Sequence, residues 1–234
     1  MLGIMAFSFK HYTRTYRYVG PMLFFGIALF FIYSVVPNPV MPSYSLTATL
    51  TFLFAAWLGF GYVDAEDVTQ QMIGSLHAGG QTKYYAARAS VIAFWTVCLS
   101  VVAVAYPILF DKFDRQPETG EALAALIGHA GLGMVGAAVS YLFTSKLVPK
   151  LSYAIIGLLL TVALSLAAGG IADALPGSLA GLIWLLPPVF PLMDAFNRHE
   201  EISAGYQSIV LAAPWAYAGI LFGLFLKLMD RKKM

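Results

Sequence analysis

The chain has 234 residues, of which 59% are hydrophobic, 15% aromatic and only 11% charged, and its mean hydropathy is +0.75. Soluble domains usually carry about 25% charged residues, so this composition excludes an ordinary soluble globule, a disordered chain and a nucleic-acid-binding protein. The net charge of +2 is too small to indicate an electrostatic partner, and the single cysteine, Cys98, excludes a disulfide within the chain. The composition predicts an all-α integral membrane protein.

A basic amphipathic segment covers residues 1–17. Apolar and aromatic side chains recur there every three or four residues, while Lys10, Arg14 and Arg17 cluster on a separate face. This pattern predicts an interfacial helix that lies in the inner headgroup layer and contacts membrane lipid; a frayed tail is the alternative. The apolar part is short and no small-residue cleavage site follows it, so the segment is not a secretion signal.

Six segments have the length and apolar character of membrane-spanning helices, for which roughly 20 residues are needed. We predict spans over residues 19–36, 46–63, 89–110, 122–143, 151–171 and 209–226. Pro21 fits the first turn of the first span, where its missing N–H costs nothing. Thr82 is predicted to cap the helix that becomes the third span.

Residues 179–193 are apolar, but Pro187, Pro188 and Pro191 interrupt any continuous helix. Because exposed irregular backbone is not tolerated in lipid, we expect a broken, re-entrant or interfacial element before the last span rather than a seventh span. The whole chain, residues 1–234, then forms a single transmembrane domain.

The distribution of charge sets the predicted orientation. With six spans, most of the 14 lysines and arginines fall on one side, and only Lys112, Arg115 and Arg198 fall on the other. The positive-inside rule places both termini in the cytoplasm of a multi-pass protein of the cell membrane.

Ionisable side chains are almost absent from the predicted spans. His129 is the exception, and we expect a neutral imidazole bonded to a neighbouring helix, with a proton carrier or ligand site as the alternative. Arg88, at the inner boundary of the third span, is expected to extend its charge toward the surface. The lack of Asp and Glu at mid-span argues against an ion-coupled pump.

Enzyme signatures are also absent. The sequence contains no serine-hydrolase elbow, zinc-protease helix or phosphate-binding loop, so we assign no catalytic, cofactor-binding or metal-binding residue. Glu200 and Glu201 resemble the paired glutamates of intramembrane prenyl-protein proteases, but Gly205 stands where that motif has arginine. We expect a solvated acidic turn there.

Small residues form packing stripes on two predicted spans. Gly219 and Gly223 make a GxxxG pair in the sixth, and Gly133 and Ala137 lie on one face of the fourth. Such residues allow helix backbones to approach closely, either within one chain or against a partner subunit.

A short amphipathic helix is predicted between the second and third spans, over residues 64–80. Acidic residues precede it, Gly79 and Gly80 end it as a C-cap would, and an apolar strip recurs every four residues. This helix is poor in lysine and arginine, which favours docking on a cytosolic protein over lying on an anionic leaflet.

In its layout, and in the sequence from Glu66 through residues 71–80 to Lys83, Tyr84 and Tyr85, the chain resembles type-2 ABC exporter permeases. The resemblance implies that the helix over residues 64–80 is a coupling helix seated in a cytosolic P-loop ATPase subunit. Its candidate ATPase contacts are Glu66, Val68, Gln71, Met72, Ser75 and Leu76.

The resemblance further implies a non-catalytic subunit that pairs with a second permease chain, identical or related. ATP and magnesium would be bound by the ATPase, not by this chain. The expected substrate is amphipathic or hydrophobic, such as a peptide or a lipid-like molecule. Two alternatives are a six-span intramembrane enzyme that uses His129 or the Glu200–Glu201 pair, and a small secondary transporter.

Overall fold

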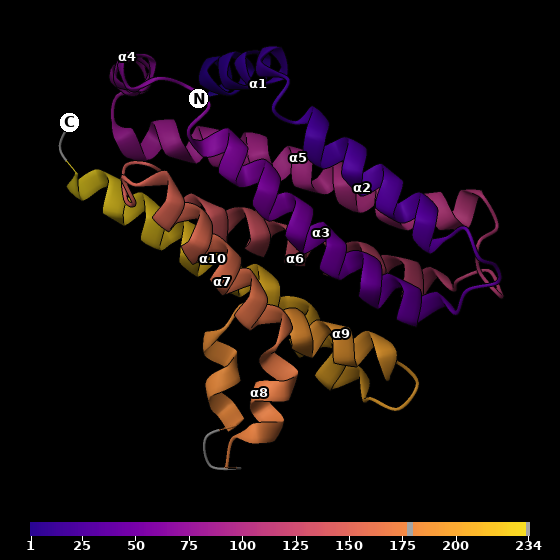
Figure 1. The fold of residues 1–234 in the computed structure, drawn as a ribbon. Helices are drawn as coiled ribbons and strands as arrows, with labels where there is room; N and C mark the ends of the chain where they lie inside the picture. Colours follow the sequence, from indigo (N-terminus) through magenta and orange to yellow (C-terminus); the bar gives the residue numbers. More distant parts are fainter. Residues whose placement is uncertain (177–179, 233–234) are drawn as a thin grey trace.

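The computed structural model describes residues 1–176 and 180–232, which form an all-helical fold (Figure 1). Within these residues no β-strand occurs, and one isolated bridge pairs Asn38 with Phe113. The elements of this part of the chain are α1 (Leu2–Thr15), α2 (Val19–Ile32), α3 (Val40–Val63), α4 (Val68–Ala78), α5 (Gln81–Leu109), α6 (Thr119–Tyr141), α7 (Leu151–Leu166), α8 (Ala168–Ala174), the 3-10 helix η1 (Ala180–Leu185), α9 (Val189–Asn197) and α10 (Ala204–Arg231).

Four of these helices, α3, α5, α6 and α10, are long and apolar enough to cross a membrane. The bent pairs α1–α2, with an angle of 74°, and α7–α8, with an angle of 62°, raise the number to six if each pair is one span. A chain with several such helices is a multi-pass membrane protein. The predicted all-α membrane class is therefore confirmed, with four to six candidate spans.

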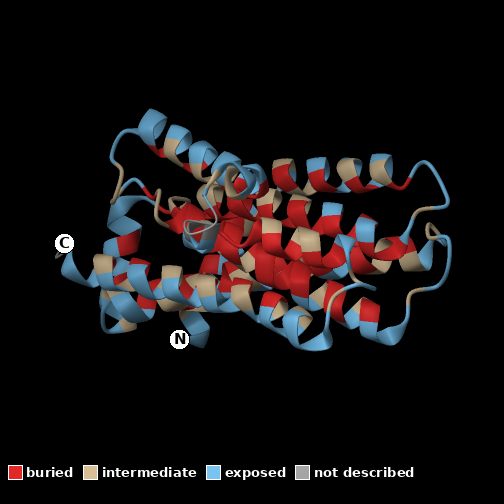
Figure 2. Cartoon of the chain, turned by 90° about the horizontal axis from the view of Figure 1, so that it is seen from below, coloured by how far each residue is buried: buried red, intermediate tan, exposed pale blue. Residues whose placement is uncertain are grey.

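The centre of the bundle is the contact between α3 and α6. A Cβ atom on Gly136 would collide with the backbone oxygen of Phe52, and one on Gly59 would collide with the hydroxyl of Ser140. Glycine at both positions lets the two backbones approach closely, as small residues do in membrane helix pairs. Figure 2 shows the buried residues concentrated along the central helices.

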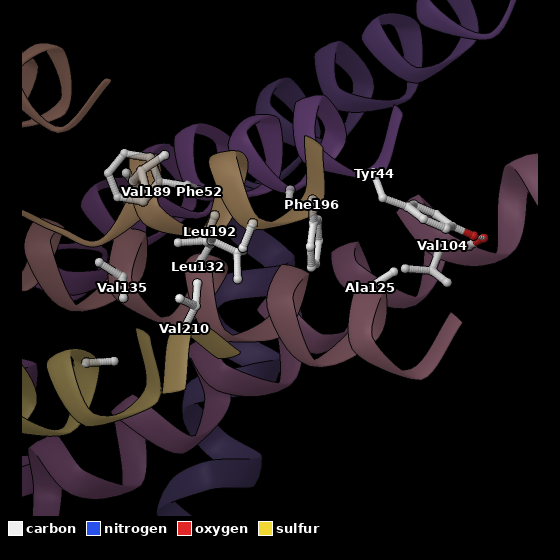
Figure 3. Close-up of a cluster of buried hydrophobic side chains, with 14 of the residues drawn as sticks. Tyr44, Phe52, Val104, Ala125, Leu132, Val135, Val189, Leu192, Phe196 and Val210 are labelled. Carbon is white, nitrogen blue, oxygen red and sulfur yellow. Dashed lines mark hydrogen bonds between the residues drawn. The ribbon is translucent and has the colours of Figure 1, made fainter. Parts of the chain in front are cut away.

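The short helix α9 completes this interior. Its residues Val189, Leu192 and Phe196 belong to the same buried cluster as Phe52 of α3 and Leu132 of α6 (Figure 3). The segment between α7 and α10 therefore contributes to the core of the bundle.

Contacts between connections define the two ends of the bundle. At one end the Gln81 side chain donates to the Lys232 carbonyl, and the Thr82 hydroxyl donates to the Asp230 carboxylate. At the other, which we call the far end, the Asn38 N–H donates to the Lys112 carbonyl. Figure 1 shows α1 and α4 at the same end as the C-terminal end of α10, and we call this the α4 end.

Helix limits differ from the predicted spans at several points. The helix of the first predicted span ends at Ile32 instead of residue 36, and that of the second begins at Val40 instead of residue 46. Pro21 lies in the first turn of α2, as predicted. The predicted cap by Thr82 is wrong, because α5 begins one residue earlier behind Gly80, so Thr82 already lies inside the helix.

The predicted fifth span, residues 151–171, is broken in two. α7 ends at Leu166, and α8 begins after Ala167 at an angle of 62°. Just beyond the break, a Cβ on Gly169 would collide with the ring of Phe190. The corner between α7 and α8 is therefore packed directly against the start of α9.

The broken element predicted over residues 179–193 begins outside the described residues, at residue 179. From residue 180 onward it consists of η1 followed by α9, with Pro187 and Pro188 at the break. Pro191 is accommodated in the first turn of α9, where the missing N–H has no helical partner. In Figure 1, α8 and η1 project from the bundle.

Candidate functional site

The short helix α4 is delimited by its own terminal residues. The Asp67 carboxylate accepts a hydrogen bond from the Gln70 N–H at 2.9 Å, an N-cap that typically contributes about 1 kcal/mol. At the other end Gly79 adopts the left-handed conformation, with φ of 74°, and the Gly80 N–H donates to the Ser75 carbonyl at 2.9 Å. The acidic start and the glycine stop predicted from the sequence are both confirmed.

The six residues predicted to contact a partner divide into two groups. Glu66, Gln71 and Ser75 are buried, whereas the side chains of the other three point outward: Val68 is 66% exposed, Met72 49% and Leu76 72%. With Ile73, which is 51% exposed, they form a patch that we call the α4 strip. Gln71 and Ser75 of this helix therefore face the protein, and its apolar strip is open.

Glu66, just before α4, forms a buried ion pair with Arg88 of α5. Its carboxylate also accepts hydrogen bonds from the Tyr84 hydroxyl at 2.6 Å and from the Ser8 hydroxyl at 2.9 Å. Both charged residues are almost inaccessible, at 3% and 0% exposure. A charge pair buried at this depth is stable only when its charges are paired and hydrogen-bonded, and of the Arg88 nitrogens only Nε lacks a partner among the described residues. The expectation that Arg88 extends toward the surface is wrong, because its charge is neutralised inside the bundle.

Arg88 also holds the end of α3. One guanidinium nitrogen donates to the Tyr62 carbonyl at 2.6 Å and to the Val63 carbonyl at 3.2 Å. These carbonyls belong to the last turn of α3, which has no helical partners for them and carries the negative end of the helix dipole. The guanidinium lies 4.8 Å from the centre of the Tyr62 ring. One side chain thus joins the end of α3, the start of the α4 segment and α5.

Two further contacts hold α4 on α5. Gln71 donates from its side-chain amide to the Glu66 carbonyl at 2.7 Å and accepts from the Tyr85 hydroxyl at 3.0 Å. Gly74 faces the Tyr84 ring, which a Cβ atom would approach to 2.6 Å. We call the connected set the Glu66 network. Its members are Ser8, Tyr62, Glu66, Gln71, Tyr84, Tyr85 and Arg88.

Helix α1 enters this network from the N-terminal segment. The Ser8 hydroxyl donates to Glu66 and accepts from the Tyr62 hydroxyl at 3.0 Å. The Tyr12 hydroxyl, one turn later on the same face, donates to the Leu58 carbonyl at 3.4 Å. The frayed-tail alternative is therefore wrong. Ser8 was not among the residues predicted from the sequence. The usable signal was its position one helical turn before Tyr12, on the face opposite Lys10 and Arg14.

The segments on either side of α4 contact two other parts of the bundle. Asp64 accepts from the Thr144 hydroxyl at 2.7 Å and from the Ser145 N–H at 2.6 Å, in the connection between α6 and α7. Nearby, desolvation lowers the pKa of Lys146, and the Asp64 carboxylate opposes that shift. On the other side, the Thr82–Asp230 hydrogen bond reaches α10. Asp64 and Thr82 thus join the segments that flank α4 to the α6–α7 connection and to α10.

His129 lies apart from this site, in α6. Its Nδ1 is 2.7 Å from the Ala125 carbonyl, which can only accept, so Nδ1 carries a proton. Its Nε2 is 2.9 Å from the Thr47 hydroxyl on α3, the bond to a neighbouring helix expected from the sequence. A neutral ring accepts the Thr47 proton there. The Nε2 contact thus joins α6 to α3, whereas the Nδ1 contact lies within α6.

The other sequence candidates lie in different surroundings. Gly133 faces Thr51 and Thr96 on neighbouring helices, and Ala137 is fully buried. Around Gly219 and Gly223 of α10, by contrast, no atom of the described residues lies within 4 Å of a Cβ position. The small-residue stripe of α6, with Gly133 and Ala137, therefore packs inside the chain. The stripe of α10, with Gly219 and Gly223, faces outward.

The acidic pair Glu200–Glu201, at the far end, is solvent-exposed. Arg198 donates to Glu201 at 3.0 Å and lies 3.6 Å from Asp194. Desolvation contributes little there, and the two carboxylates raise the pKa of Arg198. Arg198 and Glu201 line a polar pocket of about 290 Å³ with Glu200 and the Arg115–Glu121 ion pair. The described residues contain no group of three or more His, Cys, Asp or Glu side chains able to hold a metal ion.

An apolar groove of about 420 Å³ runs between α3 and α7. Leu53, Trp57 and Phe60 line it from α3, and Ile155 and Leu159 line it from α7. It lies along two apolar helices, on the outside of the bundle.

No family model, curated protein or solved structure matches this chain.

Proposed function

We propose that this chain is the permease subunit of an ATP-driven exporter in the cell membrane. A separate cytosolic P-loop ATPase would bind ATP and magnesium and dock on α4. The observation that carries the proposal is the arrangement of α4, which exposes the apolar α4 strip while Gln71, on its buried side, is held by the Glu66 network. An exposed apolar helix face of this kind suits the groove of a partner protein.

The charge distribution supports a cytoplasmic location for this surface. Lys83, Lys146 and Lys232 lie in segments joined to one another at the α4 end, and this end also carries the cations of α1. The positive-inside rule assigns such an end to the cytoplasm. With α1–α2 contributing one span and α7–α8 another, six spans leave both termini on that side.

Docking would allow a conformational change of the ATPase to be transmitted to the spanning helices. A push on the α4 strip moves Gln71, which is bonded to the Glu66 carbonyl and to Tyr85 of α5. The buried Glu66–Arg88 pair then transmits the displacement to the end of α3 and to α5. Because these bonds are protected from water, the joint is stiff compared with an exposed ion pair.

A second permease chain would complete the pathway. The outward stripe containing Gly219 and Gly223 supports close helix pairing, and only 22% of the apolar window of α10 is buried, against 72% for α6. The apolar groove between α3 and α7 supports an amphipathic or hydrophobic substrate, such as a peptide or a lipid-like molecule.

Co-purification from native membranes tests the proposal. We expect the tagged chain to retain a P-loop ATPase, and Met72→Asp or Leu76→Asp to reduce the retained ATPase at least tenfold, because each places a charge in an apolar contact. The matched control is Val35→Asp, which makes the same kind of change at a 76% exposed residue of the far end and should retain the partner.

Three results would count against an exporter permease. Retention of the ATPase by both α4 variants would remove the docking role of the strip. Transport by the purified chain alone, driven by a proton or sodium gradient, would indicate a secondary transporter. Turnover of a lipid or peptide without any ATPase, abolished by Glu201→Gln, would indicate an intramembrane enzyme.

A further inference from the structure

Helix α1 carries a cationic face without acidic partners. Lys10 and Arg14 lie one helical turn apart on α1, Arg17 follows just beyond the end of the helix, and all three are exposed. None of them belongs to an ion pair within the described part of the chain. The Arg17 guanidinium donates to the backbone carbonyls of Gly61 and Asp64. The positive charge on this face is therefore not neutralised by the protein.

Beside this face, α1 presents apolar and aromatic side chains. Leu2 is exposed, and Phe9, seven residues later on the same helix, stacks on Trp95 of α5 at 5.5 Å. Tyr16, just beyond the end of α1, is exposed as well. Phe9 also meets the exposed ring of Phe94 at 5.7 Å. Trp95 belongs to one of the helices able to span the membrane. Aromatic rings alongside uncompensated cations are typical of the headgroup level of a bilayer.

The opposite face of α1 is bonded to the Glu66 network. The Ser8 hydroxyl donates to the Glu66 carboxylate at 2.9 Å, and the main-chain carbonyl of Glu66 accepts from Gln71 of α4. A position of α1 is thus linked to a position of α4 through one buried residue. Lys10 and Arg14 lie on the other side of α1, where they can meet a charged surface.

We infer that α1 binds anionic phospholipid headgroups and that this binding stabilises α4 through the Ser8–Glu66 hydrogen bond. The occupant is lipid because the cationic face adjoins the exposed apolar and aromatic residues of α1, next to a spanning helix, whereas the α4 strip has no cation. The regulatory consequence, that an anionic leaflet would hold the ATPase-docking helix α4 in place, rests on the proposed function. The binding and its effect on α4 do not.

Lipid preference is measured first, on the full chain without any ATPase. Native mass spectrometry of the detergent-purified protein, titrated with phosphatidylglycerol or phosphatidylcholine, should show preferential binding of phosphatidylglycerol. Each cation near an anionic headgroup contributes about a fivefold factor, so Lys10→Gln with Arg14→Gln should lower the preference about 25-fold. The control Lys112→Gln, at the far end, should leave it unchanged.

The link to α4 is measured by hydrogen exchange in nanodiscs of phosphatidylcholine with or without phosphatidylglycerol. Anionic lipid should slow exchange in both α1 and α4 of the wild type. Ser8→Ala should keep the lipid preference and the slowing in α1 but lose the response of α4. Met72→Asp should respond like the wild type, so a failure of ATPase docking is distinguished from a failure of this inference.

Three outcomes would overturn the inference. One is equal binding of the two lipids by the wild type. Another is an α4 response that persists in Ser8→Ala, which would remove the proposed link. The third is unchanged lipid preference together with lost ATPase binding in the Lys10→Gln, Arg14→Gln double variant, which would assign the cationic face to the ATPase instead.

Discussion

Removing one charge of the buried Glu66–Arg88 pair should be far more costly than removing both. Glu66→Gln keeps the shape of the side chain but removes its charge. It also turns one of the two oxygens that accept from Ser8 and Tyr84 into an NH2 donor. The Arg88 guanidinium then remains buried without a counter-charge, which costs about 3–5 kcal/mol. Because both partners are at most 3% exposed, solvent screening does not reduce this cost.

A double-mutant cycle isolates the interaction. Unfolding by titration with denaturing detergent should give a loss of about 3–5 kcal/mol for Glu66→Gln and a similar loss for Arg88→Met, with a double variant well short of the sum. The exposed Arg198→Gln should cost less than about 1 kcal/mol. Additive losses, or a loss below about 1 kcal/mol for Glu66→Gln, would refute the view that this pair holds the α4 segment in place.

Three further predictions concern the bundle and the ends of α4. Gly136→Val should destabilise the chain by more than about 2 kcal/mol in the same titration, because the side chain meets the backbone of α3, whereas Gly219→Val, on an open face, should change monomer stability by less than about 0.5 kcal/mol; equal effects would contradict this packing. Thr47→Val should cost about 1–3 kcal/mol by leaving a buried nitrogen of His129 without its partner, and an unchanged midpoint would show that this bond does not stabilise the fold. Asp67→Ala should remove the N-cap of α4 and speed hydrogen exchange in its first turn about fivefold, corresponding to about 1 kcal/mol, without changing exchange in α6.

Local features were accessible to sequence analysis. The apolar lengths indicate the long helices, and Asp67 and Gly79 mark the ends of α4, because caps depend on residues within one turn of the helix terminus. The prediction of a continuous fifth span was wrong because the break in that helix involves a contact with a residue distant in sequence. The break after Leu166 is packed against Phe190, and nothing near the break in the chain indicates that contact.

The periodicity of residues 68–76 by itself determined that α4 has an apolar strip, and composition determined that the chain belongs in a membrane. Only the tertiary structure decided that the strip is open and that Gln71 and Ser75 face the bundle. The tertiary structure also decided that Glu66, just before α4, pairs with Arg88 and accepts a hydrogen bond from Ser8. Periodicity reports which residues share a face, but the neighbour of that face depends on segments that meet only when the helices pack.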